Sequence, residues 1–354
     1  MKFTIIGAGN SGQSMAAHLT LLGYNISLYD IQESLIEGIN EKGGIEVEGF
    51  IQGFAPVKAT TNLENAMENT DVIMITTTGS AHRTVARAIA PYLQDGQVIM
   101  LCPGYWGALE CRSIFRDMGM NKKVYVAETE SFIYTCHSTA PGHVQIRKIK
   151  ESLEFSALPS SDSAIVKDRL SEVYPQLKIA GSVLVTTLNN CNPILHVPIA
   201  LLNAGRIESE GEFAFFLEGA TPSVVNVVEE LEQERLVMGR HLGIKLSPAL
   251  DLLRRFYRVE ATTLYKSIQK NPVYQCEKAP VTLNHRYIYE DIPYGLHPMV
   301  ELGEKLGIHM RCCNLLIDMA SLLVKEDLRE RAVRLSDLGL ADMNPDEIVA
   351  YLEE

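Results

Sequence analysis

The first residues of the chain constrain its fold more than any other segment. Residues 2–6 form a short apolar run, and residues 7–12 read GAGNSG, with glycine at the first, third and sixth positions. Residues 11–22 then carry apolar side chains at helical spacing, and Gly23 follows them. A strand that enters a glycine-rich turn and leaves it as a helix predicts the first βα unit of a parallel sheet.

The positions of this turn suit the binding of a dinucleotide, each for its own reason. The first glycine permits the tight turn, the second lets the backbone approach a pyrophosphate, and the third allows the helix to pack closely on the strand. The two amides between the last glycines would point at the phosphate from the positive end of the helix dipole. The predicted cofactor-binding residues of the turn are Gly7, Gly9, Asn10, Ser11 and Gly12.

An acidic residue lies at the end of the second predicted strand, where such a fold binds the ribose of the cofactor. Asp30 closes the second apolar run, residues 25–29, and its carboxylate can accept hydrogen bonds from the ribose hydroxyls. The same carboxylate would repel a 2′-phosphate, and residues 31–38 contain no arginine to offset it. The sequence therefore favours NAD over NADP as cofactor.

Apolar runs and helical patterns alternate through the first half of the chain. Further strands are predicted at residues 25–29, 71–75, 97–101 and 123–126. Their runs of Val, Ile and Leu are continuous, which is typical of parallel strands covered on both faces. After residue 180 the pattern becomes mainly helical, as in residues 221–243, 247–270 and 309–325. The predicted fold is α/β plus all-α: a Rossmann-type parallel-sheet domain at 1–182, then a mainly helical substrate-binding and catalytic domain at 183–354.

The composition argues against several classes of protein. The formal net charge is −12 without a cluster of Lys and Arg, which disfavours binding to nucleic acid or to an acidic membrane surface. No apolar run reaches the roughly 18 residues of a membrane span. Seven cysteines without a CxxC spacing favour reduced thiols in a cytoplasmic protein, and no histidine spacing predicts a metal site. The acidic run Glu229–Glu234 is expected to be a solvated helical face.

Two stretches of the second half could supply acid–base chemistry, namely residues 189–198 and 285–295. Hydride transfer at a carbon bearing oxygen or nitrogen needs a proton donor or acceptor, and histidine suits this near neutral pH. A carboxylate on the far ring nitrogen fixes the tautomer, and a bidentate arginine suits a substrate carboxylate. His196, Asp291 and Arg286 could fill these roles, although any one of the nine histidines is more commonly a structural residue.

Four blocks of the sequence resemble the NAD/NADP octopine/nopaline (opine) dehydrogenase family across nearly the full length. They are GAGNSGQSMAAHLTLLGYNISLYD, ITTTGSAHRTVARAIAPYLQDGQVIMLCPGYWGALE, NPILHVPIALLNAGRIE and RYIYEDIPYGL. The last two are specific motifs, whereas the glycine pattern of the first is shared by many families. One departure is Thr77, where the family pattern would place a proline.

This resemblance implies both a reaction and roles for four residues. Family members join the amino group of an amino acid to a 2-oxo acid such as pyruvate and reduce the imine with NAD(P)H. His196 would be the proton donor, and the acceptor in reverse, with Asp291 as its partner. Asn192 would help arrange the site, and Arg286 would bind the oxo-acid carboxylate. The identity of the amino acid and of the oxo acid, the physiological direction and the subunit number stay open, with a homodimer as one candidate assembly.

Two other functions remain alternatives. One is another two-domain dehydrogenase, such as a hydroxyacid dehydrogenase or a ketopantoate-reductase-like enzyme. Those enzymes usually use a lysine at the start of the helical domain, and this chain has none between Lys178 and Lys245. The other is a non-catalytic NAD-sensing regulator, for which no basic helix-turn-helix segment is evident.

Overall fold

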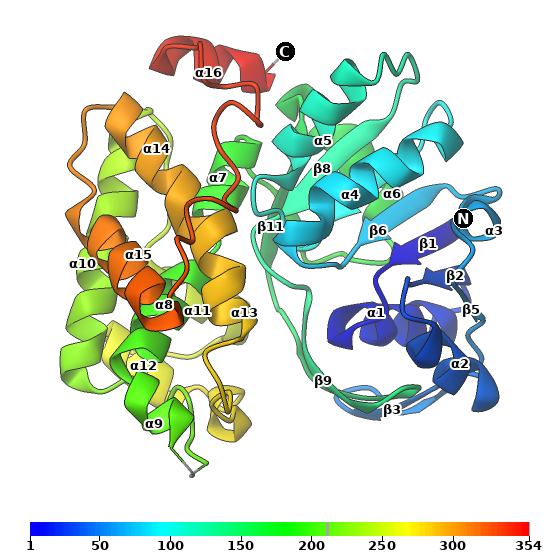
Figure 1. The fold of residues 1–354 in the computed structure, drawn as a ribbon. Helices are drawn as coiled ribbons and strands as arrows, with labels where there is room; N and C mark the ends of the chain where they lie inside the picture. The colour runs from blue at the N-terminus through cyan, green and yellow to red at the C-terminus, as the bar shows by residue number, and fades with distance from the viewer. Residues whose placement is uncertain (210–211, 354) are drawn as a thin grey trace. The chain divides into compact units, whose positions relative to one another are not determined.

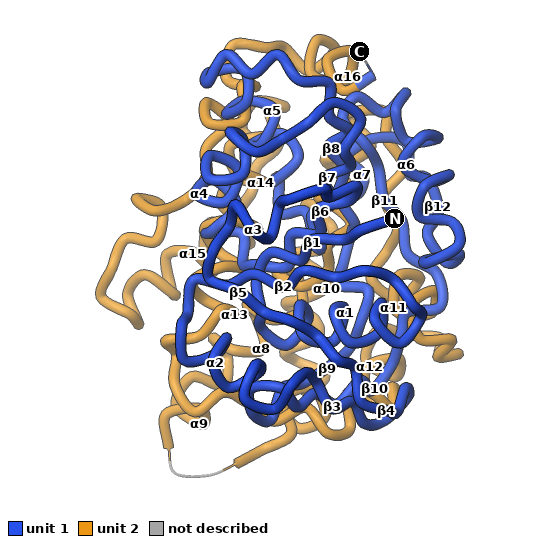
Figure 2. Tube along the Cα trace, turned by 90° about the vertical axis from the view of Figure 1, so that its right-hand side faces the viewer, with its two compact units in different colours: residues 1–186, 353–354 blue, residues 187–352 orange. Residues whose placement is uncertain are grey.

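The computed structural model describes residues 1–209 and 212–353, which form two compact units (Figures 1 and 2). Unit 1 comprises residues 1–186 and the described end of the chain at Glu353, and unit 2 comprises residues 187–352. The division falls inside helix α7 (Val183–Leu188). The sequence places a functional boundary just before this helix, between residues 182 and 183, and that boundary stays a prediction.

Unit 1 is built on an eight-stranded sheet with the order β12-β11-β8-β7-β6-β1-β2-β5. The strands are β1 (Lys2–Ile6), β2 (Asn25–Tyr29), β5 (Ala59–Thr60), β6 (Val72–Ile75), β7 (Val98–Leu101), β8 (Tyr125–Thr129), β11 (Leu153–Leu158) and β12 (Leu177–Ile179). Every pairing is parallel except the one between β8 and β11. The central strands β6 and β7 are buried along their whole length, as their continuous apolar runs predict.

The helices of unit 1 connect these strands in the expected alternation. They are α1 (Asn10–Leu21), α2 (Glu33–Glu41), α3 (Leu63–Met67), α4 (Gly79–Ile89), α5 (Gly107–Asp117) and α6 (Ser163–Leu170), with short 3₁₀ turns η1 (Ala90–Tyr92) and η2 (Ser160–Asp162). Because α1 leaves β1 through the glycine-rich turn, the positive end of this helix lies at the carboxyl end of β1.

A second, smaller sheet of unit 1 was not evident in the sequence. Its strands are β3 (Ile45–Gly49), β4 (Gly53–Ala55), β9 (Tyr134–Ala140) and β10 (His143–Ile149), in the order β4-β3-β10-β9. The parallel pair β3–β10 joins segments nearly one hundred residues apart, so no local pattern announces it. Helix α1 lies between the main sheet and this one and contacts β2, β4 and β9 (Figure 1).

Unit 2 is helical, which confirms the predicted fold class. Its elements are α8 (Asn192–Leu202), α9 (Ala204–Glu208), α10 (Pro222–His241), α11 (Ala249–Tyr257), α12 (Leu264–Lys270), η3 (Tyr274–Cys276), α13 (Arg286–Tyr289), the π-helical turn η4 (Asp291–Leu296), α14 (His297–Lys305), α15 (Arg311–Val324) and α16 (Pro345–Glu353). Helix α8 packs against α10, α13, α15 and η4. It is therefore the central helix of the unit.

One predicted helix is divided in two. Residues 247–270 were expected to be one continuous helix, but α11 ends at Tyr257, and the next residue, Arg258, has a left-handed φ of 56°. Helix α12 then starts afresh, because the Thr263 side chain accepts a hydrogen bond from the Lys266 amide as its N-cap.

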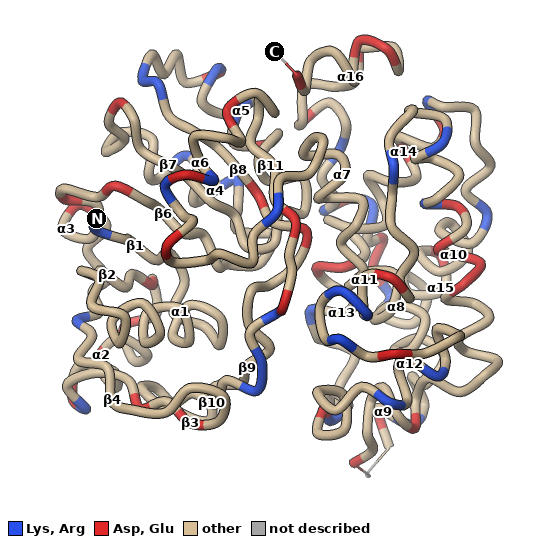
Figure 3. Tube along the Cα trace, turned by 180° about the vertical axis from the view of Figure 1, so that it is seen from behind, with Lys and Arg blue, Asp and Glu red and all other residues tan. Residues whose placement is uncertain are grey.

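Charged residues are spread over both units. Lys and Arg are interspersed with Asp and Glu along the described chain and do not form one continuous stripe (Figure 3). Among the described residues, no helix combines the length and apolar character that crossing a membrane requires.

Candidate active site

The glycine-rich turn has the geometry that the sequence predicts for a dinucleotide loop. Gly7 adopts a φ of +99°, which side-chain-bearing residues rarely adopt. A Cβ on Gly12 would lie 1.7 Å from the Gly7 carbonyl oxygen, so only glycine lets α1 approach β1 this closely. A Cβ on Gly9, by contrast, would meet nothing within 4 Å. The open space at Gly9 is where a pyrophosphate would approach the backbone.

The start of α1 is also suited to an anion. Its N-cap is Gly9, which has no side chain to accept hydrogen bonds from the first-turn amides. Asn10 directs its Oδ1 elsewhere, to the Ser138 amide at 3.0 Å, and Ser11 is buried. The amides of the first turn thus remain the groups that would hold a phosphate, and the turn fits NAD(P).

Asp30 lies beside this turn, at the end of β2. Its Oδ2 accepts a hydrogen bond from the Ala8 amide at 2.6 Å, and its Oδ1 accepts one from the Gln32 amide at 3.0 Å. The carboxylate is therefore fixed in position while its residue stays partly exposed. At Thr77, the departure from the family pattern, the side-chain methyl packs against Gly7, where an added Cβ would approach it to 2.9 Å.

In unit 2, the structure brings His196 and Asp291 together although they are 95 residues apart in the chain. The His196 Nδ1 lies 2.8 Å from the Asp291 Oδ2. His196 is 8% exposed and Asp291 is fully buried. His196 comes from the second turn of α8, and Asp291 begins the π-helical turn η4, a distortion often found at functional sites. The predicted contact is confirmed.

A second contact sets the spacing between α8 and η4. A Cβ on Gly295 would lie 2.3 Å from the Pro193 Cγ, so the two elements meet at van der Waals distance only because residue 295 is glycine. Pro193 lies one turn before His196, and Gly295 lies one turn after Asp291. Both residues lie in sequence blocks that resemble the family, but their contact has no local signal in the sequence.

Aromatic rings surround the His196 imidazole. The Tyr287 ring centroid lies 4.1 Å from that of His196, and those of Phe215 and Phe216 lie 6.3 and 6.0 Å away. Tyr287, Phe215 and Phe216 are all buried. Burial raises the pKa of Tyr287 well above its ordinary value, so its hydroxyl stays protonated near neutral pH. The three rings therefore pack around the imidazole of His196 and limit the orientations that it can take.

Arg286 has an acidic partner that was not predicted from the sequence. Its Nε and Nη2 lie 2.6 and 2.5 Å from the Oε2 of Glu290, which is buried and one turn further along. The neighbouring His285 caps α13, since its Nδ1 accepts a hydrogen bond from the Tyr287 amide. Burial, with Arg286 and His196 nearby, lowers the pKa of His285 to about 4, so this ring is neutral near pH 7.

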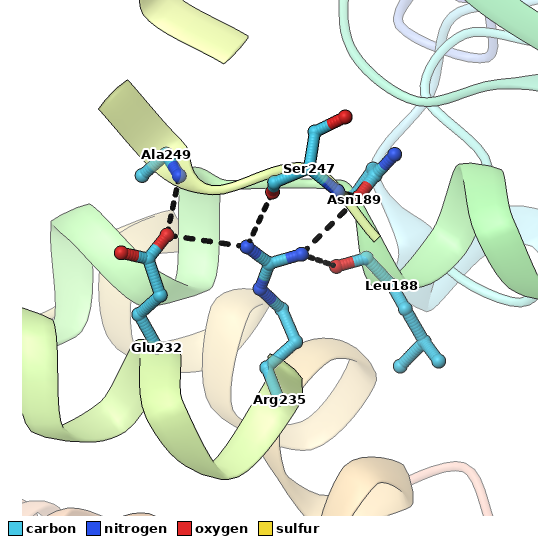
Figure 4. Close-up of polar contacts among 6 residues, drawn as sticks. All are labelled: Leu188, Asn189, Glu232, Arg235, Ser247 and Ala249. Carbon is cyan, nitrogen blue, oxygen red and sulfur yellow. Dashed lines mark hydrogen bonds and ion pairs between the residues drawn. The ribbon is translucent and has the colours of Figure 1, made fainter. Parts of the chain in front are cut away.

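Asn192 starts α8, one turn before His196, and its amide donates to the Asn190 Oδ1 at 3.1 Å. The segment just before it is anchored by a buried arginine (Figure 4). Arg235 is 1% exposed; its Nη1 donates to the Leu188 carbonyl and the Asn189 Oδ1, both at 3.1 Å. Its Nη2 donates to the Ser247 carbonyl at 2.7 Å and pairs with Glu232 at 3.2 Å. These contacts fix the start of α8.

The expectation of a solvated acidic face on α10 is wrong at two positions. Glu232 is buried against Arg235 and also accepts a hydrogen bond from the Ala249 amide. The Glu234 carboxylate accepts hydrogen bonds from the amides of Cys312 and Cys313, and so caps α15 from a neighbouring helix. The pattern of charges along one helix does not reveal partners that arrive from other helices.

The described residues contain no cluster of His, Cys, Asp and Glu that could hold a metal ion. All seven cysteines belong to this described part, and no disulfide joins any of them.

Comparisons with known proteins agree with this geometry. Residues 179–324 match the family described as NAD/NADP octopine/nopaline dehydrogenase, alpha-helical domain, and residues 2–105 match the N-terminus of NAD-dependent glycerol-3-phosphate dehydrogenase. The chain is 34% identical to opine dehydrogenase of Arthrobacter sp. (strain 1C), covering 96% of each chain.

Solved structures share the fold. Octopine dehydrogenase in complex with NADH and agmatine superposes with a TM-score of 0.79 at 18% identity, covering 99% of this chain and 98% of the other. The same enzyme has been solved with NADH and L-arginine, and with NADH and pyruvate. Yersinopine dehydrogenase bound to NADP⁺ gives a TM-score of 0.75 at 14% identity, covering 100% and 98%. With its long match at 34% identity, the chain belongs to the opine dehydrogenase family of NAD(P)-dependent oxidoreductases that act on CH–NH bonds.

Proposed function

We propose that the protein catalyses the NADH-dependent reductive condensation of an amino acid with a 2-oxo acid, with His196 and Asp291 as its proton-transfer pair. The observation that carries the proposal is the 2.8 Å contact between His196 Nδ1 and Asp291 Oδ2 in a chain of this family. The octopine dehydrogenase complexes support the substrate classes, since they contain L-arginine or pyruvate together with NADH.

The reaction joins two substrates before it reduces them. The amino group attacks the carbonyl carbon of the oxo acid, water leaves, and a C=N bond forms. The bound cofactor supplies the hydride that reduces the imine carbon. An amine and a 2-oxo acid, with NADH and one proton, thus give a secondary amine, NAD⁺ and water.

The role of His196 follows from its hydrogen bond. With Nδ1 donating to Asp291, the ring presents Nε2 to its surroundings, as a proton acceptor when neutral and as a donor when charged. In the condensing direction the charged ring would donate its proton to the departing hydroxyl group. Water then leaves, and the imine that forms is protonated. In the reverse direction the neutral ring would accept the proton. Asp291 would hold the tautomer and stabilise the imidazolium.

Arg286 and Asn192 are proposed to bind and arrange the substrates. Arg286 would bind the carboxylate of the oxo acid, which a planar guanidinium suits. Because Glu290 already pairs with this guanidinium, the substrate carboxylate would share it. Asn192, at the start of α8 and one turn from His196, would help to orient the amine.

We propose NADH rather than NADPH as the preferred cofactor. The Asp30 carboxylate is fixed by two backbone amides beside the turn, where it would accept the ribose hydroxyls. Two like charges about 4 Å apart repel by roughly 1–4 kcal/mol depending on screening, which corresponds to a preference of about five-fold or more. Similar structures contain either NADH or NADP⁺. The proposed preference for NADH therefore rests on the residues of this chain and not on the fold.

A screen of NADH oxidation tests the proposal. Pyruvate and 2-oxoglutarate are crossed with a panel of amino acids, and each is also assayed alone. The proposal expects oxidation only when both substrates are present, and a product whose mass is the sum of the two, less one oxygen. Oxidation with an oxo acid alone would instead indicate a hydroxyacid dehydrogenase.

A further inference from the structure

A buried glutamine connects the small sheet of unit 1 to the middle of the glycine-rich turn. Gln13 lies on α1 and is 1% exposed. Its Oε1 accepts a hydrogen bond from the Gly142 amide at 2.9 Å, in the loop between β9 and β10. Its Nε2 donates to the Ala8 carbonyl at 2.8 Å and to the Ser138 Oγ at 3.3 Å. Both ends of the side chain are therefore used: Oε1 contacts the β9–β10 loop, and Nε2 contacts the glycine-rich turn and β9.

Ala8 links Gln13 to the carboxylate of Asp30, which is proposed to bind the ribose. Its amide donates to the Asp30 Oδ2 at 2.6 Å, while its carbonyl accepts from Gln13. A continuous chain of hydrogen bonds thus runs from Gly142 through Gln13 and Ala8 to Asp30. The Asn10 Oδ1, which accepts from the Ser138 amide, is a second attachment of the turn to β9.

The position of Ala8 explains why such an anchor matters. Ala8 stands between two glycines, the residues with the greatest backbone freedom. The peptide unit is planar and trans, so a fixed Ala8 carbonyl also fixes the direction of the Gly9 amide, which points away from Gln13. The Gln13 side chain therefore fixes the orientation of the Gly9 amide. Through the Ala8 amide, it also fixes the position of the Asp30 carboxylate.

We propose that Gln13 is a cofactor-positioning residue, which orients the Ala8–Gly9 peptide for the pyrophosphate and holds Asp30 for the ribose. Its effect on affinity needs only that the turn binds NAD(H). Its effect on the choice between NADH and NADPH rests on the proposed role of Asp30. The small sheet then contributes to cofactor binding from behind α1, without touching the cofactor.

Two substitutions of Gln13 separate positioning from general stability. Gln13→Met keeps the length of the side chain but removes all three of its side-chain hydrogen bonds. Gln13→Glu can still accept from Gly142, but its ionised carboxylate cannot donate to Ala8. We expect either variant to raise the Kd for NADH about ten-fold and to reduce the ratio of the NADPH Kd to the NADH Kd, measured by fluorescence titration of the full chain.

Gln97 provides a matched control. It is also buried, and it also joins two backbone groups: its Nε2 donates to the Thr70 carbonyl at 2.7 Å and its Oε1 accepts from the Gln94 amide at 2.8 Å. It precedes β7, at the amino end of the strands and away from the turn. Gln97→Met should lower the melting temperature to a similar degree but leave both cofactor Kd values unchanged.

The outcomes are distinct. Equal cofactor Kd values in wild type, Gln13→Met and Gln13→Glu would overturn the proposal, as would an equal loss of affinity in Gln97→Met. If wild type binds NADH and NADPH equally, the role of Asp30 fails, but the NADH Kd of the Gln13 variants still decides the role of Gln13. The two-substrate oxidation assay of wild type tests the catalytic proposal separately.

Discussion

The glycine-rich turn of unit 1 and the His196 site of unit 2 each depend on a different kind of contact. The turn consists of contiguous residues, and its closest approaches are between groups of one βα unit and the neighbouring strand end. His196 and Asp291 are 95 residues apart and meet only because α8 and η4 pack at one particular distance. The glycine-rich turn can form as soon as its βα unit folds. The His196–Asp291 pair also needs the correct spacing between α8 and η4.

This difference predicts how the two regions respond to substitution. In the turn, a small change can remove cofactor affinity without disturbing the fold, because the ligand would occupy open space. In the His196 site, a small change between α8 and η4 can remove activity without touching a catalytic side chain, since displacements of about 1 Å can cost up to 100-fold in rate.

The largest effect is expected at His196 itself. His196→Gln removes the group that is proposed to exchange a proton, so turnover should fall by roughly 10²–10⁴-fold, the usual contribution of general acid–base catalysis. The Kd for NADH should change little, since the proposed cofactor turn belongs to unit 1. Steady-state kinetics and NADH titration check both parts. Turnover near that of wild type would mean that another side chain moves the proton.

A substitution outside the proposed proton-transfer pair should have the next largest effect. Gly295→Ala places a Cβ 2.3 Å from the Pro193 Cγ and must push η4 away from α8. We expect turnover to fall by about 10- to 100-fold, with the Kd for NADH unchanged. Gly205→Ala is the control, because a Cβ there meets nothing within 4 Å. Equal activity in the two variants would show that the spacing of α8 and η4 is not critical.

In the turn, Gly9→Ala should act on binding alone. Gly9 has a φ of −68° and an extended ψ, which alanine adopts without strain, and the added Cβ meets no protein atom within 4 Å. It would occupy the space proposed for the pyrophosphate. The Kd for NADH should rise about ten-fold, or 1.4 kcal/mol, at an unchanged melting temperature. An unchanged Kd would place the pyrophosphate elsewhere.

Much of the first region could be predicted from the sequence, because its signals are local. The turn, the ends of β1 and α1, and the buried central strands all follow from residue type and spacing over short windows. The small sheet could not be predicted in this way, since β3 and β10 pair across nearly one hundred residues. The contacts of Gln13 could not be predicted either, because they join the Ala8 carbonyl to the distant β9–β10 loop.

In the second region, the contact between His196 and Asp291 could be predicted from the sequence, but the side chains around it could not. The family resemblance pointed to His196, Asp291 and Arg286, and the first two meet as expected. The pairing of Arg286 with Glu290 and the contact of Gly295 with Pro193 depend on how the helices pack. Glu232 and Glu234 were misassigned as solvated because the amides that they bind belong to other helices, Ala249 for Glu232 and the start of α15 for Glu234.

The smallest expected effect concerns stability in acid. Burial lowers the pKa of His82 to about 4, only partly opposed by the Thr77 backbone. The unfolded chain takes up this proton below its ordinary pKa of about 6.5, whereas the folded chain does not. Stability from this residue is thus fully present above pH 6.5 and is lost as the pH falls toward 4. Between pH 6.5 and 5.5 the loss should be about 1 kcal/mol.

Urea unfolding of wild type and His82→Gln across this range isolates the effect, because all other histidines are common to both proteins. The advantage of wild type should shrink as the pH falls. A difference in unfolding free energy that stays constant with pH would show that His82 takes up its proton equally well in the folded state.

The central claim is that His196 and Asp291 act as one unit, and a double-mutant cycle tests it most directly. Turnover is measured for His196→Gln, Asp291→Asn and the double variant, with NADH binding as the control for folding. If Asp291 acts only through His196, the double variant should be no slower than His196→Gln alone, since removing the partner of an absent group costs nothing further. If the two losses multiply, Asp291 acts independently of His196, and the proposed proton-transfer pair would be contradicted.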